Sequence, residues 1–174
     1  AWPLLKGAWA GYRAMLEEDG DGGLHLPVSV SPEYKGSRMD AWGADSSFQL
    51  AALHAVLREL PRAAEELGEP VDPAWADAAR RVPPFCAETR PQSDEFPETT
   101  RERIVLWRGQ DLDGSHRHHS HLAGLTPFRT LDPQGEHAGI LRNSLAWWIR
   151  RGPGGWSGWC VPWASMIHAR CGRP

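Results

Sequence analysis

The sequence has 174 residues, enough for one domain with a sizeable hydrophobic core. Hydrophobic residues make up 41% of the chain and charged residues 24%, proportions that are typical of a globular domain. The net charge of -3 and the pI near 6.2 argue against a nucleic-acid-binding protein, because such proteins usually carry a basic stripe. No apolar run approaches the roughly 20 residues that cross a bilayer, so we expect no contact with a membrane.

The start of the chain and its cysteines give little information about location. No basic segment followed by an apolar core opens the sequence, so no signal peptide is visible, and both secreted and cytoplasmic locations stay open. Cys86, Cys160 and Cys171 are odd in number and widely spaced, which favours buried free thiols over a disulfide framework. The ten tryptophans are expected mainly in the core, and sugar stacking is favoured only where several of them line one cleft.

Helical spacing begins at the N-terminus. Residues 2–18 place Leu5, Trp9 and Tyr12 on one face of a predicted helix, which the turn at 19–23 ends. A second helix is predicted over 45–60 from its repeating apolar positions. We expect Asp45 to act as its N-terminal cap, with Ser46 as the alternative. Pro61 and Gly68 are expected to bound the segment that follows this helix.

The second half of the chain alternates predicted helices with long loops. A helix over 70–82 has Asp72 as its cap and Pro73 at its first position. Residues 83–103 are rich in proline and charge, which predicts a long loop. Further helices are predicted over 136–152 and 155–172. Strand-like alternation is weak throughout, so the predicted fold class is all-α, with long loops that carry the function.

A cluster of histidines lies in the segment SHRHHSHLAGL. His116, His118, His119 and His121 fall within six positions. A His–x–His pair can bind zinc or copper, but neither Cys nor HExxH spacing accompanies it, so we predict no metal site and no cofactor. The two remaining interpretations are recognition of sugar hydroxyls and hydrogen bonds to loop carbonyls. We expect the four histidines to be divided between these two roles.

Glu33 is the candidate proton donor. Cleavage of a glycosidic bond needs one protonated carboxyl for the leaving oxygen and a second group that activates water or attacks the sugar. The donor keeps its proton near neutral pH only in a partly dehydrated setting, which the apolar-flanked loop after Pro32 could supply. The alternative is a solvated loop glutamate. In the segment GGWSGW, residues 154–159, glycines allow close backbone approach, as at the start of a packed helix.

Taken in order, these motifs resemble the catalytic domain of family 95 glycoside hydrolases, the inverting alpha-L-fucosidases. The resemblance covers nearly the whole chain, and the His-Arg-His segment is its most specific part. Four stretches carry it: SVSPE at 29–33, GADSSFQLAALHAVL at 43–57, DLDGSHRHHSHLAGLTPF at 111–128, and GGWSGWCVPWASMIHARCG at 154–172.

The resemblance implies an (α/α)6 toroid barrel, of which residues 1–174 would be a middle part truncated at both ends. The remainder of the same polypeptide would complete the barrel. The implied substrate is an oligosaccharide or glycan that carries an alpha-L-fucoside, or a related sugar such as L-galactose. Glu33 falls on the family's general acid, and the predicted substrate-binding residues are His116, Arg117, His118 and Trp42.

Two features depart from the family's pattern. Its water-activating groups, an Asn-x-Asn pair and the Asp of a Gln-Ile-Asp-Gly-Asn segment, do not occur in these residues. We therefore expect residues 1–174 alone to be inactive, and the alternative function is a non-catalytic carbohydrate-binding fragment. Tyr34 stands where the family usually has a polar residue such as Asn or Gln, which bears on the identity of the sugar.

Overall fold

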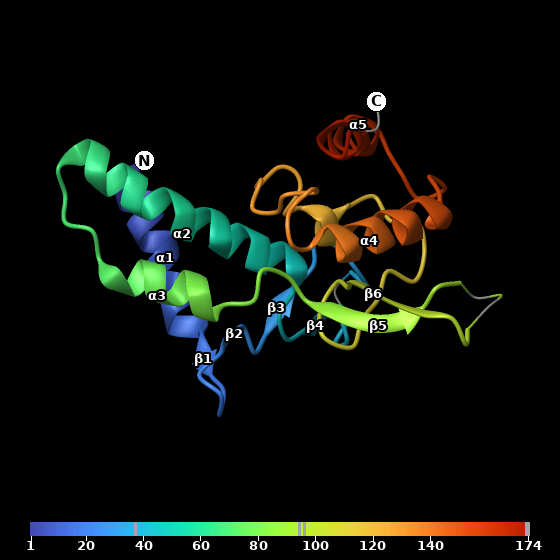
Figure 1. The fold of residues 1–174 in the computed structure, drawn as a ribbon, viewed down its shortest axis with the longest axis horizontal. Coiled ribbons are helices and arrows are strands. Elements are labelled where there is room, and N and C mark those ends of the chain that lie inside the picture. Colours follow the sequence, from blue (N-terminus) through green and yellow to red (C-terminus); the bar gives the residue numbers. More distant parts are fainter. Residues whose placement is uncertain (37, 94, 96, 173–174) are drawn as a thin grey trace.

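The computed structural model describes residues 1–36, 38–93, 95 and 97–172, and shows a helix-rich chain with small antiparallel hairpins (Figure 1). The expected helical scaffold is confirmed, and the complete toroid stays a prediction. In the part of the chain that the structure describes, no helix is both long and apolar enough to cross a membrane. The helices are α1 Trp2–Met15, α2 Ser47–Leu67, α3 Pro73–Arg81, α4 Ala138–Arg151 and α5 Cys160–Arg170.

The strands pair as three two-stranded antiparallel sheets. They are β1 Glu17–Glu18 with β2 Leu24–His25, β3 Ser29–Val30 with β4 Trp42–Gly43, and β5 Ala87–Pro91 with β6 Thr100–Ile104. The prediction of an all-α chain with a long loop over residues 83–103 is therefore wrong in this region. In strands β5 and β6, five of the ten positions are exposed and only Arg103 and Ile104 are buried, so the strands have almost no apolar alternation to reveal them.

Helices α1, α2 and α3 pack around one hydrophobic core, on the left-hand side of Figure 1. Its largest buried members are Trp9, Leu26, Leu50, Leu53, Leu57, Leu60 and Trp75. The expectation that Pro61 ends the helix is wrong, because α2 continues through it to Leu67. An interior proline costs about 3 kcal/mol, and the burial of Leu60 and Ala64 on either side offsets that cost. Gly68 ends the helix in the left-handed conformation, with φ of 67°.

Asp72 caps α3 as expected, because its carboxylate accepts the N–H of Ala74 at 2.9 Å. The expected cap at Asp45 is wrong. The Asp45 carboxylate instead accepts the N–H of Leu26 at 2.9 Å and lies 2.6 Å from Nη2 of Arg108 and 2.8 Å from Nδ1 of His25. A buried carboxylate requires such partners, so this side chain ties β2 and the segment after β6 to the start of α2.

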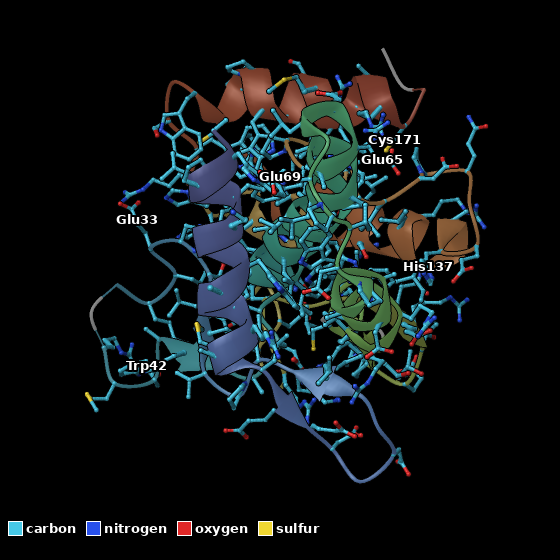
Figure 2. The ribbon with its side chains drawn as sticks, turned by 90° about the vertical axis from the view of Figure 1, so that its left-hand side faces the viewer. Glu33, Trp42, Glu65, Glu69, His137 and Cys171 are labelled. Carbon is cyan, nitrogen blue, oxygen red and sulfur yellow. The ribbon has the colours of Figure 1, made fainter. Side chains whose placement is uncertain are left out.

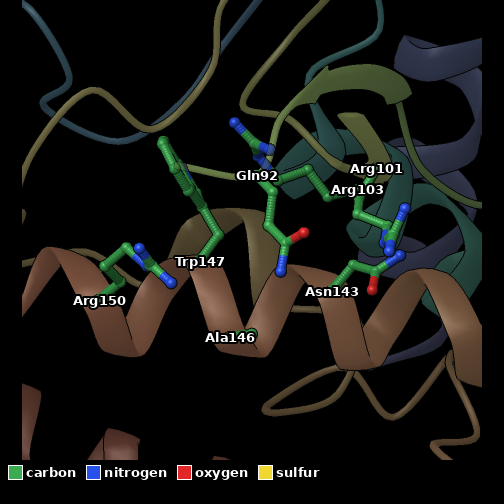
Figure 3. A pocket seen from close by; sticks show the side chains of 7 residues that line it. All are labelled: Gln92, Arg101, Arg103, Asn143, Ala146, Trp147 and Arg150. Carbon is green, nitrogen blue, oxygen red and sulfur yellow. The ribbon is translucent and has the colours of Figure 1, made fainter. Parts of the chain in front are cut away.

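A second core lies between α4, α5, β6 and residues 105–131. Two guanidinium groups pack over the ring of Trp147 in α4. The Cζ atoms of Arg103 and Arg151 lie 3.8 Å and 3.7 Å from its ring centroid. Arg103 also forms an ion pair with Asp111. Figure 3 shows the hollow of about 50 Å³ beside Trp147, which Arg101, Arg103 and Arg150 also line. No predicted site residue lines this hollow.

Candidate active site

The loop between β3 and β4 carries Glu33. The backbone φ is 54° at Glu33, 59° at Lys35 and 61° at Gly36, so two non-glycine residues adopt the left-handed conformation. Each such residue costs on the order of 1–3 kcal/mol and persists only where surrounding contacts fix it. One fixing contact joins Oγ of Ser31 to Oγ of Ser120 at 2.5 Å. The loop is therefore attached directly to the histidine segment.

Tyr34 provides the second attachment. Its hydroxyl accepts the N–H of Asp113 at 3.0 Å, and its ring packs edge-on against Trp107 with centroids 5.7 Å apart. Burial raises the pKa of Tyr34 to about 12, so the hydroxyl stays protonated. The ring also lies 5.1 Å from that of His116. Tyr34, which departs from the family's pattern, thus helps to fix the loop that carries Glu33.

Glu33 meets two residues of the histidine segment, some 85 positions later in the chain. Its Oε2 accepts a hydrogen bond from Nε of Arg117 at 2.5 Å and lies 2.6 Å from Nε2 of His118. His116 supports this arrangement, because its Nδ1 accepts the backbone N–H of His118 at 3.1 Å. The structure therefore places four of the five predicted site residues in one cluster.

The Glu33 carboxylate is ionised in this arrangement. The hydrogen bond with His118 and, second, that from Arg117 hold the pKa of Glu33 below its usual range, and 53% of its side chain is exposed. The expectation of a dehydrated carboxyl that keeps its proton is therefore wrong here. A carboxyl can act as an acid from this state only if the donors around it change partners.

Replacing His118 with Ala should raise the pKa of Glu33, because the hydrogen bond with His118 is the largest cause of its lowering. A lowered carboxyl pKa stabilises the fold above the pKa of the unfolded chain, and this stability is lost as the pH falls through the folded value. The variant should therefore lose less stability on acidification. Carbon-13 NMR titration of glutamate carboxyls measures the shift, with Glu33→Gln for assignment and His137→Ala as control. An unchanged pKa would show that His118 is not the cause.

His119 and His121 serve the core instead of the cluster. Nε2 of His119 lies 3.0 Å from the carbonyl oxygen of Cys160, and Nε1 of Trp148 donates to its Nδ1 at 3.1 Å. His119 therefore binds a main-chain carbonyl, as expected for part of this segment, but that carbonyl belongs to the first residue of α5 and not to a loop. His121 is buried, neither of its ring nitrogens has a hydrogen-bond partner in the described structure, and burial lowers its pKa to about 3. Among the described residues, no group of three or more His, Cys, Asp or Glu side chains could hold a metal ion.

The GGWSGW segment packs against the start of the histidine segment. The N–H of Gly155 donates to Oγ of Ser115 at 2.8 Å, and a Cβ atom at Gly155 would lie 2.4 Å from the carbonyl oxygen of Ser115. The close backbone approach expected from these glycines therefore occurs at this residue. It also brings Trp159 to the cluster, where its ring lies 4.8 Å from that of His118. The sequence assigned no role to Trp159. The one pattern that singles out this residue is a bulky ring beside small residues.

Gly155→Ala should destabilise the protein by about 1–3 kcal/mol, because its methyl group would overlap a backbone oxygen that cannot move independently. Gly154→Ala is a matched control, since a Cβ atom there would meet nothing within 4 Å. Urea unfolding of both variants measures the difference. Equal stability of the two would contradict the close approach at Gly155.

Trp42 stands apart from the cluster. Half of its side chain is exposed, and its Nε1 donates to the carbonyl oxygen of Met39 at 2.7 Å. It lines, together with Glu33, a hollow of about 340 Å³ formed by the β3–β4 loop. In Figure 2, Glu33 lies between Trp42 and α5, the red helix. Trp42 thus shares a hollow with Glu33, and its contact with a sugar stays a prediction.

Comparison with known families gave one match. The model of the glycosyl hydrolase family 95 catalytic domain matches residues 1–174. No curated protein matched the chain.

Proposed function

We propose that this chain, which belongs to the family of glycosyl hydrolase family 95 catalytic domains, hydrolyses alpha-L-fucosides or glycosides of a related sugar such as L-galactose. The proposed reaction inverts the anomeric centre, with Glu33 as general acid. The observation that carries this proposal is the contact of one loop carboxylate with Arg117 and His118. These three side chains offer a proton carrier and several hydrogen-bond donors at one point.

In this proposal, Glu33 takes up its proton from solvent as the sugar binds. Nε2 of His118 lies 2.6 Å from Oε2 of Glu33 without the sugar, so this hydrogen bond has to open before the carboxyl keeps a proton there. When a sugar binds, its hydroxyls take over the donors of Arg117 and His118. The sugar also excludes water from the half-exposed carboxylate. Both changes raise the pKa of Glu33, so the carboxyl gains its proton where the glycosidic oxygen arrives.

Inversion needs a second group that activates water. In inverting enzymes this group stands about 6.5–9.5 Å from the acid, which leaves room for the water. The groups that the family resemblance implies for this role do not occur in residues 1–174. We therefore propose that the remainder of the same polypeptide supplies it, and that residues 1–174 alone bind sugar without turnover.

The experiment that tests this function follows the first product formed by the full-length protein. Samples are incubated with 4-nitrophenyl alpha-L-fucoside or the matching alpha-L-galactoside, and proton NMR spectra are recorded before the released sugar mutarotates. We expect the beta anomer to appear first. First appearance of the alpha anomer would contradict inversion. Binding of the sugar without release of nitrophenol would instead favour the non-catalytic function.

A further inference from the structure

An apolar hollow of about 390 Å³ opens beside the cluster, and no role proposed so far uses it. It lies between the start of α2, residues 127–128 and α5. Its walls include Phe48, Pro127, Phe128, Trp159, Trp163 and Met166. The volume falls within the range of about 300–1,000 Å³ that small-molecule sites occupy. A concave site with this lining suits the flat apolar face of a ligand.

Side-chain contacts connect this hollow to the proposed general acid. Glu33 binds His118, and the His118 ring lies 4.8 Å from the ring of Trp159. Trp159 in turn stacks on Trp163, with ring centroids 5.7 Å apart and an interplanar angle of 24°. Trp163 is fixed, because its Nε1 donates to the carbonyl oxygen of Thr126 at 2.7 Å. Trp159 nevertheless keeps 47% of its surface exposed, which is a large apolar exposure for a side chain this close to the cluster.

We propose that Trp159 and Trp163 form the platform of a leaving-group subsite. This inference rests on the proposed function. A general acid contacts the glycosidic oxygen. It therefore lies between the fucose-type sugar whose anomeric carbon is attacked and the leaving group that keeps this oxygen. Arg117 and His118 supply polar donors on one side of Glu33, which suit the hydroxyls of the released sugar. The hollow that begins at Trp159, next to His118, is lined by apolar side chains, so it suits a pyranose that presents its C–H face, or an aromatic leaving group.

The test compares substrates that share one sugar and differ in the leaving group. In the full-length protein, Trp159→Ala should lower kcat/KM by about tenfold for 4-nitrophenyl alpha-L-fucoside and for a fucosyl disaccharide, the upper end of what an aromatic contact contributes. With alpha-L-fucosyl fluoride, which has no leaving-group surface, the loss should be about twofold or less. Trp159→Phe should retain most of the activity. Val161→Ala, an exposed change on α5 outside the hollow, is the matched control. Equal losses on all three substrates would overturn the subsite.

Binding measurements separate failure of the subsite from failure of the proposed function. Saturation-transfer NMR with methyl beta-D-galactopyranoside or 4-nitrophenol as the probe should show binding to the wild type and to Glu33→Gln. Trp159→Ala should lose this binding. Binding of the probe by a protein that hydrolyses no fucoside would leave the subsite standing and reject the proposed reaction. Hydrolysis of fucosides by a protein that binds neither probe would reject the subsite alone.

Discussion

Glu33→Gln should lower kcat on a fucoside with a poor leaving group by about 100- to 10,000-fold, the contribution of a general acid in other enzymes. Glutamine has the size of glutamate and can keep a hydrogen bond with Arg117 or His118, but its amide is too weak an acid to protonate the glycosidic oxygen. The loss should shrink on alpha-L-fucosyl fluoride, because fluoride departs without protonation by a carboxyl. Steady-state kinetics on both substrates measure the two losses.

Glu65→Gln is the control for this experiment. Glu65 is an exposed residue on α2, and Figure 2 shows it well away from Glu33. This variant should retain wild-type rates on both substrates. A loss below about tenfold for Glu33→Gln on the poor substrate would remove Glu33 from the acid role.

Asp111→Ala should destabilise the protein by about 3–5 kcal/mol, the cost of breaking one side of a buried ion pair. The Arg103 side chain is 3% exposed and that of Asp111 is 12% exposed, so loss of the carboxylate leaves a guanidinium buried against Trp147 without its counter-charge. The carbonyl oxygen of Asp111 also accepts a hydrogen bond from the Tyr34 hydroxyl at 3.4 Å. A shift of the segment around Asp111 would move Tyr34 and the loop that carries Glu33, so activity should fall together with stability. Urea unfolding monitored by tryptophan fluorescence measures the change.

Two further variants make this prediction specific. Asp77→Ala removes an exposed carboxylate that pairs with Arg80 and Arg81, and should destabilise the protein much less than Asp111→Ala, because solvent screens this pair. Replacing both members of the buried pair, as Arg103→Met with Asp111→Leu, should cost less than Asp111→Ala, because no charge is then left unpaired. If Asp111→Ala were no worse than Asp77→Ala, the buried pair would not stabilise this fold.

The helical scaffold could be predicted from the sequence because burial leaves a period in it. The apolar positions of α2 and the cap at Asp72 are local signals, and both are confirmed. Strands β5 and β6 left no such signal, since five of their ten positions are exposed and their register is set by backbone pairing. Asp45 was misassigned for a related reason. Its partners His25 and Arg108 lie 20 and 63 residues away, beyond the range of any capping rule.

Part of the candidate site could also be predicted from the sequence, and part could not. Family resemblance placed Glu33, Arg117 and His118 in one site, and the structure brings their side chains together. The ionisation of Glu33 could not be predicted, because it depends on donors about 85 residues away whose direction no spacing rule gives. Trp159 was missed because an exposed tryptophan before a helix looks the same in sequence whether it packs or binds.

A series of fucosides whose leaving groups differ in acidity tests the role of Glu33 most directly. In the wild type, proton donation compensates for a poor leaving group, so log(kcat/KM) should change little across the series. In Glu33→Gln, the same plot should fall steeply as the pKa of the leaving group rises. Parallel plots for the two proteins would mean that Glu33 gives no proton to the departing oxygen, and would contradict its assignment as the general acid.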